Sequence, residues 1–219
     1  VKLRFLNPAL SRLELLPSTW PLATDGVRLL YDPVYVLHAY AKERNMPVRS
    51  YLHVVLHCVF QHFYVDLRVD PTIWNLACAM AVEAMITEMG LDCAQVAREQ
   101  RQQAALAPIR KAVGQLTAAK LYHYLLRHRP DVDSLVHLSR LFWADEHEAW
   151  YIASVTDEWN EQGERASKEA GDSDKEGYVG AHHQLSEDAG RMAQAQRRLR
   201  EQWEAVPQRL PVDLWTFLK

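Results

Sequence analysis

The 219-residue chain lacks the features that mark membrane, secreted or nucleic-acid-binding proteins. It has no apolar run near the ~18 residues that a membrane span needs, and no signal-peptide layout at its start. Its formal net charge is only -3, so no strong electrostatic field attracts nucleic acid or an anionic membrane. These absences predict a cytoplasmic protein that binds neither nucleic acid nor membrane.

Cysteine is scarce, and its spacing excludes the common metal-binding and redox motifs. Cys58, Cys78 and Cys93 are odd in number and lack CxxC spacing, and all three fall in segments with helical apolar periodicity. This pattern favours buried free thiols in a reducing compartment. The motifs GxSxG, GxGxxG and a glycine-rich phosphate loop are also absent, so serine hydrolases and nucleotide-binding enzymes find no support.

The residues that are present can build one sizeable core, since 48% are hydrophobic and 24% are charged. We expect a single, mainly α-helical domain over residues 1–219. Its predicted parts are an N-terminal segment with a small sheet (1–32), a helical core that carries the candidate site (33–160), a polar, glycine-rich flexible loop (161–180) and C-terminal helices (181–219).

Local patterns predict where the sheet and the helices lie. Thr24-Asp25-Gly26 is a turn signal, VRLLY is strand-like, and Asp32-Pro33 ends the strand, which together indicate a hairpin. Asp70-Pro71 is typical of a helix start, and Gly90 of a helix end. Helices are predicted over 34–45, 48–64, 72–89, 93–103, 117–128, 131–142, 147–162 and 184–206.

The segment 48–64 contains YLHVVLHCVFQH and is apolar on almost every side. Its polar exceptions form one stripe at three- and four-residue spacing: Ser50, His53, His57, Gln61 and Tyr64. Two imidazoles at positions i and i+4 of a helix can share one zinc ion. The alternative is a pair of hydrogen-bonded core histidines without metal.

Glu83 and His62 are the two candidates for a third metal ligand. Glu83 lies in a polar stripe of the apolar helix predicted over 72–89, where a carboxylate is costly to bury unless it is paired or binds metal. The two stripes face each other if the helices pack antiparallel; otherwise Glu83 faces solvent or bonds a histidine without metal. His62 follows His57 by five residues and points ~140° away from it on an unbroken helix. It can join the site only if the helix ends or bends near Gln61.

Four blocks together resemble a known family. In order, TDGVRLLYDPVYV, YLHVVLHCVFQH, WNLACAMAVEAMI and ADEHEAWY are similar to a metallopeptidase domain found in bacteria upstream of a von Willebrand factor A-like domain. The resemblance covers roughly 20–150 and implies a zincin-like fold. It matches His53, His57 and His62 to the family's three histidines. It also places Asn75 on a site helix.

The chain departs from the family pattern at positions that matter for chemistry. Val54 stands where the HExxH motif has glutamate, the group that takes a proton from water in zinc peptidases. Ala79 and Glu83 stand where the family has aspartate and asparagine. Ordinary peptide hydrolysis is therefore not expected, although Glu83, one turn beyond Ala79, can return a carboxylate to the site.

The block ADEHEAWY supplies two more candidates at the mouth of the site. The resemblance matches Asp145 and His147 to a family segment that follows the helices. Asp145 is also typical of a helix N-cap. His147 is a candidate metal ligand or transition-state donor, and Glu146 between them is a candidate base.

The sequence is compatible with three functions. The first is a degenerate, zinc-binding metallopeptidase that serves as a binding or adaptor module in a larger assembly. The second is an active zinc-dependent hydrolase of peptides or proteins, with Glu83 or Glu146 as base. The third is a metal-free helical interaction domain, in which His53 and His57 are core residues. The resemblance further implies a von Willebrand factor A-like domain in the same chain or complex and, by gene association, a MoxR-type AAA+ ATPase as partners.

Overall fold

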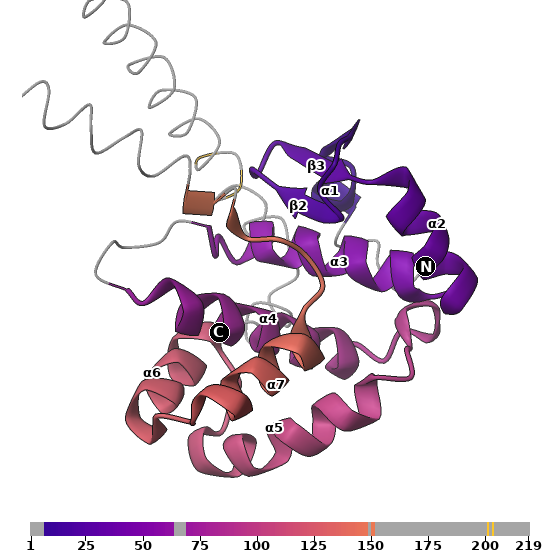
Figure 1. Cartoon of the computed structure of the whole chain (residues 1–219). Coiled ribbons are helices and arrows are strands. Elements are labelled where there is room, and N and C mark those ends of the chain that lie inside the picture. Colours follow the sequence, from indigo (N-terminus) through magenta and orange to yellow (C-terminus); the bar gives the residue numbers. More distant parts are fainter. Residues whose placement is uncertain (1–6, 64–68, 149, 152–200, 202, 204–219) are drawn as a thin grey trace, which may run out of the picture.

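The computed structural model describes residues 7–63, 69–148, 150, 151, 201 and 203. These residues form mainly helices with a small three-stranded sheet near the N-terminus, as the sequence predicts (Figure 1). Most of the helix predicted over 147–162, the loop predicted over 161–180 and the helices predicted over 181–219 lie outside the described residues. No helix in the described part is both long and apolar enough to cross a membrane.

The sheet contains the predicted hairpin and one further strand. Its strands are β1 (Glu14–Pro17), β2 (Leu22–Thr24) and β3 (Arg28–Tyr31), in the order β1-β3-β2. Strand β3 runs antiparallel to β2 and parallel to β1. In the turn, Asp25 Oδ1 accepts hydrogen bonds from two backbone amides at 3.0 and 2.7 Å, and Gly26 takes a φ of 84°. The hairpin is therefore fixed by local turn chemistry.

Two aspartate-proline pairs start helices where the sequence predicts them. Helix α2 (Pro33–Lys42) is capped by Asp32, and α4 (Pro71–Glu88) is capped by Asp70, whose carboxylate accepts from the backbone amide of Ile73. Proline fits the first turn of a helix because its missing N–H has no partner there. Between them lies α3 (Met46–Val59), which ends earlier than predicted.

The later helices are α5 (Glu99–Val113), α6 (Ala118–His128) and α7 (Val132–Phe142), and short helical segments lie at Asn7–Leu10 (α1) and Asp92–Ala94 (η2). The starts of α6 and α7 are confirmed. The helix predicted over 93–103 is wrong at both ends. The Asn45 amide donates to the carbonyls of Asp92 and Gln95, both at 3.0 Å, and these tertiary bonds hold the chain out of a helix before Glu99.

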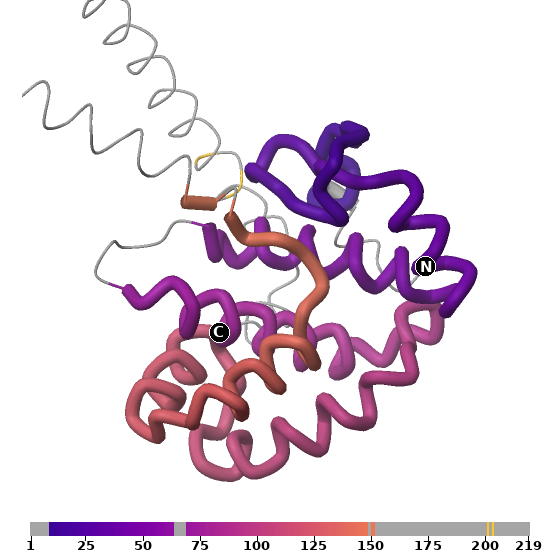
Figure 2. Tube along the Cα trace, in the orientation of Figure 1, coloured from indigo at the N-terminus to yellow at the C-terminus, as the bar shows by residue number. Residues whose placement is uncertain are grey.

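Helix α4 lies at the centre of the fold. Figure 2 shows the course of the chain around it. It contacts α3 on one side and α5, α6 and α7 on the other. Its buried residues include several alanines, which allow close approach of these neighbours. After α7 the chain crosses back past α4 and α3 toward the sheet (Figures 1 and 2). This return places residues 143–147 beside α3.

Candidate metal centre

The polar stripes of α3 and α4 meet in the core, as antiparallel packing of the two helices requires. Arg49 NH2 contacts Thr87 Oγ1 at 3.1 Å, His53 Nδ1 contacts Glu83 Oε1 at 2.8 Å, and Trp74 Nε1 donates to the carbonyl of His62 at 3.1 Å. Residues later in and after α3 thus pair with residues earlier in α4. The condition under which the two polar stripes face each other is therefore met.

His53 and His57 lie side by side on consecutive turns of α3, and both are fully buried. Their Nε2 atoms are 2.8 Å apart. His53 Nε2 also lies 3.4 Å from Asp145 Oδ1, and His57 Nε2 lies 3.9 Å from the same oxygen. The Nδ1 atom of His53 is occupied on the opposite edge of its ring by Glu83. Its Nε2 edge therefore faces the other histidine and Asp145.

A sharp helix end brings His62 back toward His57. The backbone amide of Gln61 donates to the carbonyl of Cys58 at 3.1 Å, and that of His62 donates to the carbonyl of His57 at 3.0 Å. Gln61 takes a left-handed φ of 57°. This bonding is a Schellman motif, with glutamine at the position that usually holds glycine. As a result, His62 Nδ1 lies 2.9 Å from His57 Nδ1, on the side away from His53.

Asp145 and His147 enter the site from the chain that returns after α7. The backbone amide of Glu146 donates to the carbonyl of Leu22 at 2.7 Å, which anchors this segment on β2. His147 Nε2 lies 3.0 Å from Asp145 Oδ1. The other oxygen, Asp145 Oδ2, is buried without a hydrogen-bond partner among the described residues. The interpretation of Asp145 as an N-cap is wrong, because its carboxylate faces the histidines.

Four buried donors form a cluster that fits a metal ion: His53, His57, Asp145 and His147. One ligand atom from each lies within 4.8 Å of the ligand atoms of the other three. Donors on a tetrahedral zinc ion at ~2.0–2.1 Å lie about 3.3 Å from one another. Separations in the cluster include 2.8 Å between the two Nε2 atoms and 3.9 Å from His57 to Asp145, and none exceeds 4.8 Å, so the value for zinc lies within their range. The orphaned Oδ2 of Asp145 also fits a site that takes a cation.

The pKa shifts of His57 and Asp145 suit metal binding, which needs neutral imidazoles and ionised carboxylates, whereas the shift of His53 opposes it. Burial lowers the pKa of His57 well below its usual value, and burial also lowers the pKa of His62 to about 3. Burial opposes ionisation of Asp145, but His147, His53 and His57 together outweigh it and hold the pKa of Asp145 well below its usual range. For His53, burial is outweighed by hydrogen bonds to Asp145 and Glu83, which raise its pKa.

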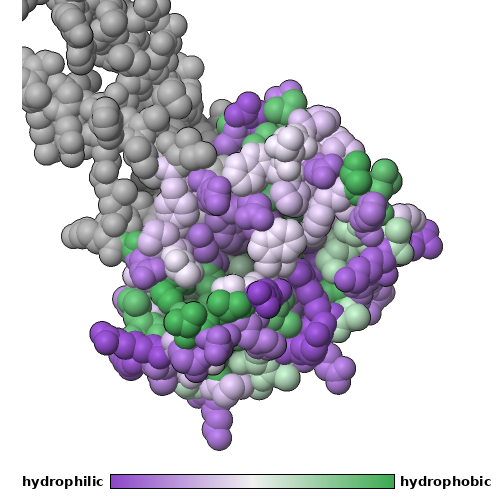
Figure 3. All heavy atoms as spheres, in the orientation of Figure 1, coloured by the Kyte–Doolittle hydropathy of each residue, from purple (hydrophilic) through white to green (hydrophobic). Residues whose placement is uncertain are grey.

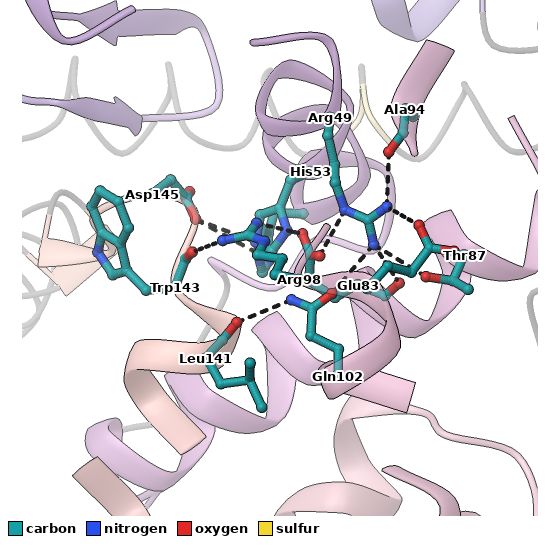
Figure 4. A network of polar contacts seen from close by, with 12 residues as sticks. Arg49, His53, Glu83, Thr87, Ala94, Arg98, Gln102, Leu141, Trp143 and Asp145 are labelled. Carbon is teal, nitrogen blue, oxygen red and sulfur yellow. Dashed lines mark hydrogen bonds and ion pairs between the residues drawn. The ribbon is translucent and has the colours of Figure 1, made fainter. Parts of the chain in front are cut away.

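Glu83 is held by positive charge on the far side of His53 (Figure 4). Its Oε2 accepts from Arg49 Nε at 2.8 Å, and its Oε1 lies 3.3 Å from Arg98 NH2. Burial would raise the pKa of Glu83, but the hydrogen bond to His53 and the charges of His53, Arg98 and Arg49 lower it to about 2. An ionised Glu83 accepts a hydrogen bond from the Nδ1–H of His53, which leaves the Nε2 lone pair free to bind a metal.

Comparison with known proteins gives one informative result. Residues 10–209 match the model of a family described as "Putative metallopeptidase domain". The chain belongs to this family. Neither the curated proteins nor the solved structures contain a significant match.

Other predicted site residues of this metallopeptidase-family chain lie around the cluster. Asn75 Oδ1 accepts from the hydroxyl of Tyr151 at 2.6 Å, beyond the cluster. Val54 is fully buried in the main hydrophobic core. Glu146 is half-buried, and it lies between two residues whose side chains meet each other. Among the described residues, no hydrogen bond or ion pair joins the Glu146 carboxylate to the cluster. Burial raises the pKa of Tyr35 on α2, and the charge of Glu146 adds to that rise.

Sequence reasoning missed the two arginines of this metallopeptidase-family site. Arg49 is fully buried one turn before His53, and Arg98 lies just before α5. A signal for Arg49 existed, because arginine in an otherwise apolar helix is rarely buried unless it is paired. Arg98 had no local signal, since its partners come from distant parts of the chain.

The two buried cysteines, Cys58 and Cys78, are expected to be unreactive in the folded protein. Cys58 and Cys78 are buried, and burial raises the pKa of both thiols, so little thiolate forms. Cys93 is exposed, which corrects the expectation that all three thiols are buried. We expect iodoacetamide to alkylate the folded protein at Cys93 alone and the urea-unfolded protein at every cysteine, as peptide mass spectrometry would show. Rapid alkylation of Cys58 in the folded protein would contradict this assignment.

Proposed function

We propose that this chain is a metal-binding member of the metallopeptidase family that has lost efficient hydrolysis and serves as a binding module. The observation that carries the proposal is the buried set of four donors, His53, His57, Asp145 and His147, within 4.8 Å of one another. A buried carboxylate with a free oxygen is costly unless a cation joins it. Zinc is the ion that this donor set and this family favour.

The missing base supports impaired hydrolysis. Zinc in a peptidase polarises the scissile carbonyl and acidifies a water molecule, and a nearby carboxylate must take the proton. The residue after His53 is Val54, whose methyl groups cannot accept a proton and which packs in the core. Without a general base the rate falls by roughly 10²–10⁴-fold.

The two carboxylates that could replace this base are poorly placed for the task. Glu83 is fully buried, and Arg49, Arg98 and His53 already occupy its two oxygens. A carboxylate whose pKa is held near 2 by these partners is a weak proton acceptor. Glu146 has no hydrogen bond or ion pair to the cluster within the described residues, and its charge acts on Tyr35 instead. Both residues therefore favour the non-hydrolytic alternative.

The number of donors supports the same conclusion. Catalytic zinc sites hold the metal with three protein ligands and keep a fourth position for water, whereas structural sites use four. Here the cluster supplies four donors from two separate parts of the chain, α3 and the segment after α7. In the proposal the metal ties these parts together, and the zincin-like arrangement of the site helix beside a small sheet serves as a scaffold.

The binding role is supported by an apolar surface away from the metal centre. Helix α2 has no buried residue, and Val34, Leu37 and Tyr40 repeat at three-residue spacing with exposed fractions of 61%, 67% and 49%. In Figure 3, apolar side chains are visible at the corner of the molecule where α2 lies in Figure 1. An exposed apolar helix face is typical of protein contacts. A von Willebrand factor A-like domain or a MoxR-type ATPase remains the proposed partner.

Hydrolysis of a fluorogenic casein tests this function. We expect the zinc-loaded protein to hydrolyse casein no faster than the chelator-treated protein, because no carboxylate is placed to serve as base. Zinc-dependent turnover that disappears in Glu146→Gln or Glu83→Gln, but survives in the exposed neighbour variant Glu148→Gln, would overturn the proposal in favour of an active hydrolase.

A further inference from the structure

Arg98 contacts Glu83, the hydrogen-bond partner of His53, and also the backbone just before Asp145, so it reaches the surroundings of both halves of the metal centre. The half on α3 carries His53 and His57, and the half after α7 carries Asp145 and His147. We propose that Arg98 is a positioning residue of the metal centre, which holds the Asp145 and His147 segment in place relative to His53. This inference rests on the proposed function, because it presumes that the cluster binds metal.

The contacts of Arg98 are short, and each one reaches a group that orients a donor (Figure 4). Arg98 NH2 lies 3.3 Å from Glu83 Oε1, the same oxygen that His53 Nδ1 contacts at 2.8 Å. Arg98 NH1 donates to the backbone carbonyl of Trp143 at 2.6 Å, two residues before Asp145. One rigid, planar guanidinium therefore fixes the spacing between the carboxylate behind His53 and the backbone that carries Asp145.

The segment after α7 needs such an anchor. Helix α7 ends at Phe142, and Trp143 turns the chain into an extended conformation with φ -58° and ψ 131°. Beyond Asp145, the amide of Glu146 is fixed on the carbonyl of Leu22. Asp145 thus lies between two backbone anchors, one of which is Arg98. Loss of either anchor frees the segment to move its two donors away from α3.

Arg49 differs from Arg98 in this respect. Its guanidinium contacts Glu83, Thr87, Ala94, Glu99 and Gln102. These partners lie on or next to α4 and α5, and within the described part of the chain no hydrogen bond or ion pair joins Arg49 to residues 143–147. Arg49 therefore joins helices of the core, whereas Arg98 connects Glu83, which bonds His53, to the backbone that precedes Asp145.

Whether removal of Arg98 weakens or tightens zinc binding distinguishes a positioning role from a purely electrostatic one. A guanidinium repels a metal ion, so charge alone predicts that removing Arg98 tightens zinc binding. Positioning predicts the opposite, because a donor set that is no longer held in place loses affinity. Loss of a group that orients a metal ligand typically weakens binding by about 10- to 100-fold.

The experiment measures zinc dissociation constants by competition with a chromophoric chelator, together with the unfolding temperature of each metal-free protein. The variants are Arg98→Met, which keeps the apolar stem without donors, and Arg98→Lys, which keeps the charge without the two-pronged contact. The matched control is Arg110→Met on α5, which removes a surface partner of Glu88.

We expect Arg98→Met to weaken zinc binding by about 10- to 100-fold and Arg98→Lys by a smaller factor. Arg110→Met should bind like the parent. Affinity of Arg98→Met equal to or tighter than that of the parent overturns the inference. If Arg98→Met does not fold, Arg98→Lys decides, since parent-like affinity contradicts positioning and weaker affinity supports it. Failure of the parent itself to bind zinc contradicts the proposed function, and the inference falls with it.

Discussion

The variant Asp145→Asn is expected to bind zinc at least about 100-fold more weakly than the parent, while its metal-free form remains folded. Asp145 supplies the only carboxylate of the four-donor cluster, and Oδ1 lies within 3.4 Å of His53 Nε2 and 3.0 Å of His147 Nε2. Asparagine keeps the size and an oxygen acceptor for these histidines, but it is neutral and a far poorer zinc ligand. Because Oδ2 has no hydrogen-bond partner in the described part, the main loss to the metal-free fold is the attraction between the Asp145 charge and the neighbouring histidines.

Two measurements separate the loss of metal from the loss of fold in this variant. Zinc affinity is measured by chelator competition, and stability by urea unfolding of the metal-free protein, which should change by no more than about 2 kcal/mol. Asp133→Asn, at an exposed position of α7, is the matched control and should leave both quantities unchanged. Zinc affinity of Asp145→Asn equal to that of the parent would remove Asp145 from the ligand set.

Loss of the Glu83 carboxylate is expected to produce the largest change in stability. Glu83→Ala should lower the free energy of unfolding of the metal-free protein by about 3–5 kcal/mol. Arg49 and Glu83 both have almost completely buried side chains, and they form an ion pair at 2.8 Å. Without Glu83, the guanidinium of Arg49 stays buried and keeps only its weaker or more exposed partners. His53 Nδ1 also loses its hydrogen-bond acceptor.

The control for Glu83 lies on the same helix. Glu88 pairs with Arg110 at 2.5 Å, but the two side chains are 32% and 41% exposed. A surface pair of this kind contributes at most about 1 kcal/mol, so Glu88→Ala should have a small effect. Denaturant unfolding curves of both variants give the comparison. Equal stabilities of Glu83→Ala and Glu88→Ala would show that the buried network contributes nothing beyond a surface ion pair.

The parts of the fold that follow from the sequence are those with local causes. The hairpin comes from the turn at Asp25 and Gly26, and α2 and α4 start at aspartate-proline pairs. Strand β1 had no such signal, because its four residues are all exposed and it depends on pairing with β3. The irregular chain before α5 was also missed, since bonds from Asn45, far away in sequence, determine it.

In the candidate site, too, the features with local causes could be predicted and those that depend on distant contacts could not. The periodicity of α3 predicts that His53 and His57 share one face, and packing brings Glu83 to that face. The bend at Gln61 could be stated only as a condition, because glutamine has no preference for a left-handed conformation. The contribution of Asp145 depends on how the chain returns after α7, which no local pattern determines. For the same reason, the connection made by Arg98 could not be read from spacing.

The family match and the donor cluster together define the central question, which is whether this chain binds metal. The most direct measurement is the zinc content of protein purified without chelator or nickel, determined by elemental analysis. The parent is compared with a His53→Ala, His57→Ala double variant and with a His128→Ala, His137→Ala control at exposed positions. We predict about one zinc ion per chain in the parent and the control, and almost none in the double variant. Absence of zinc from the parent, even after zinc is added back, would contradict the metal centre.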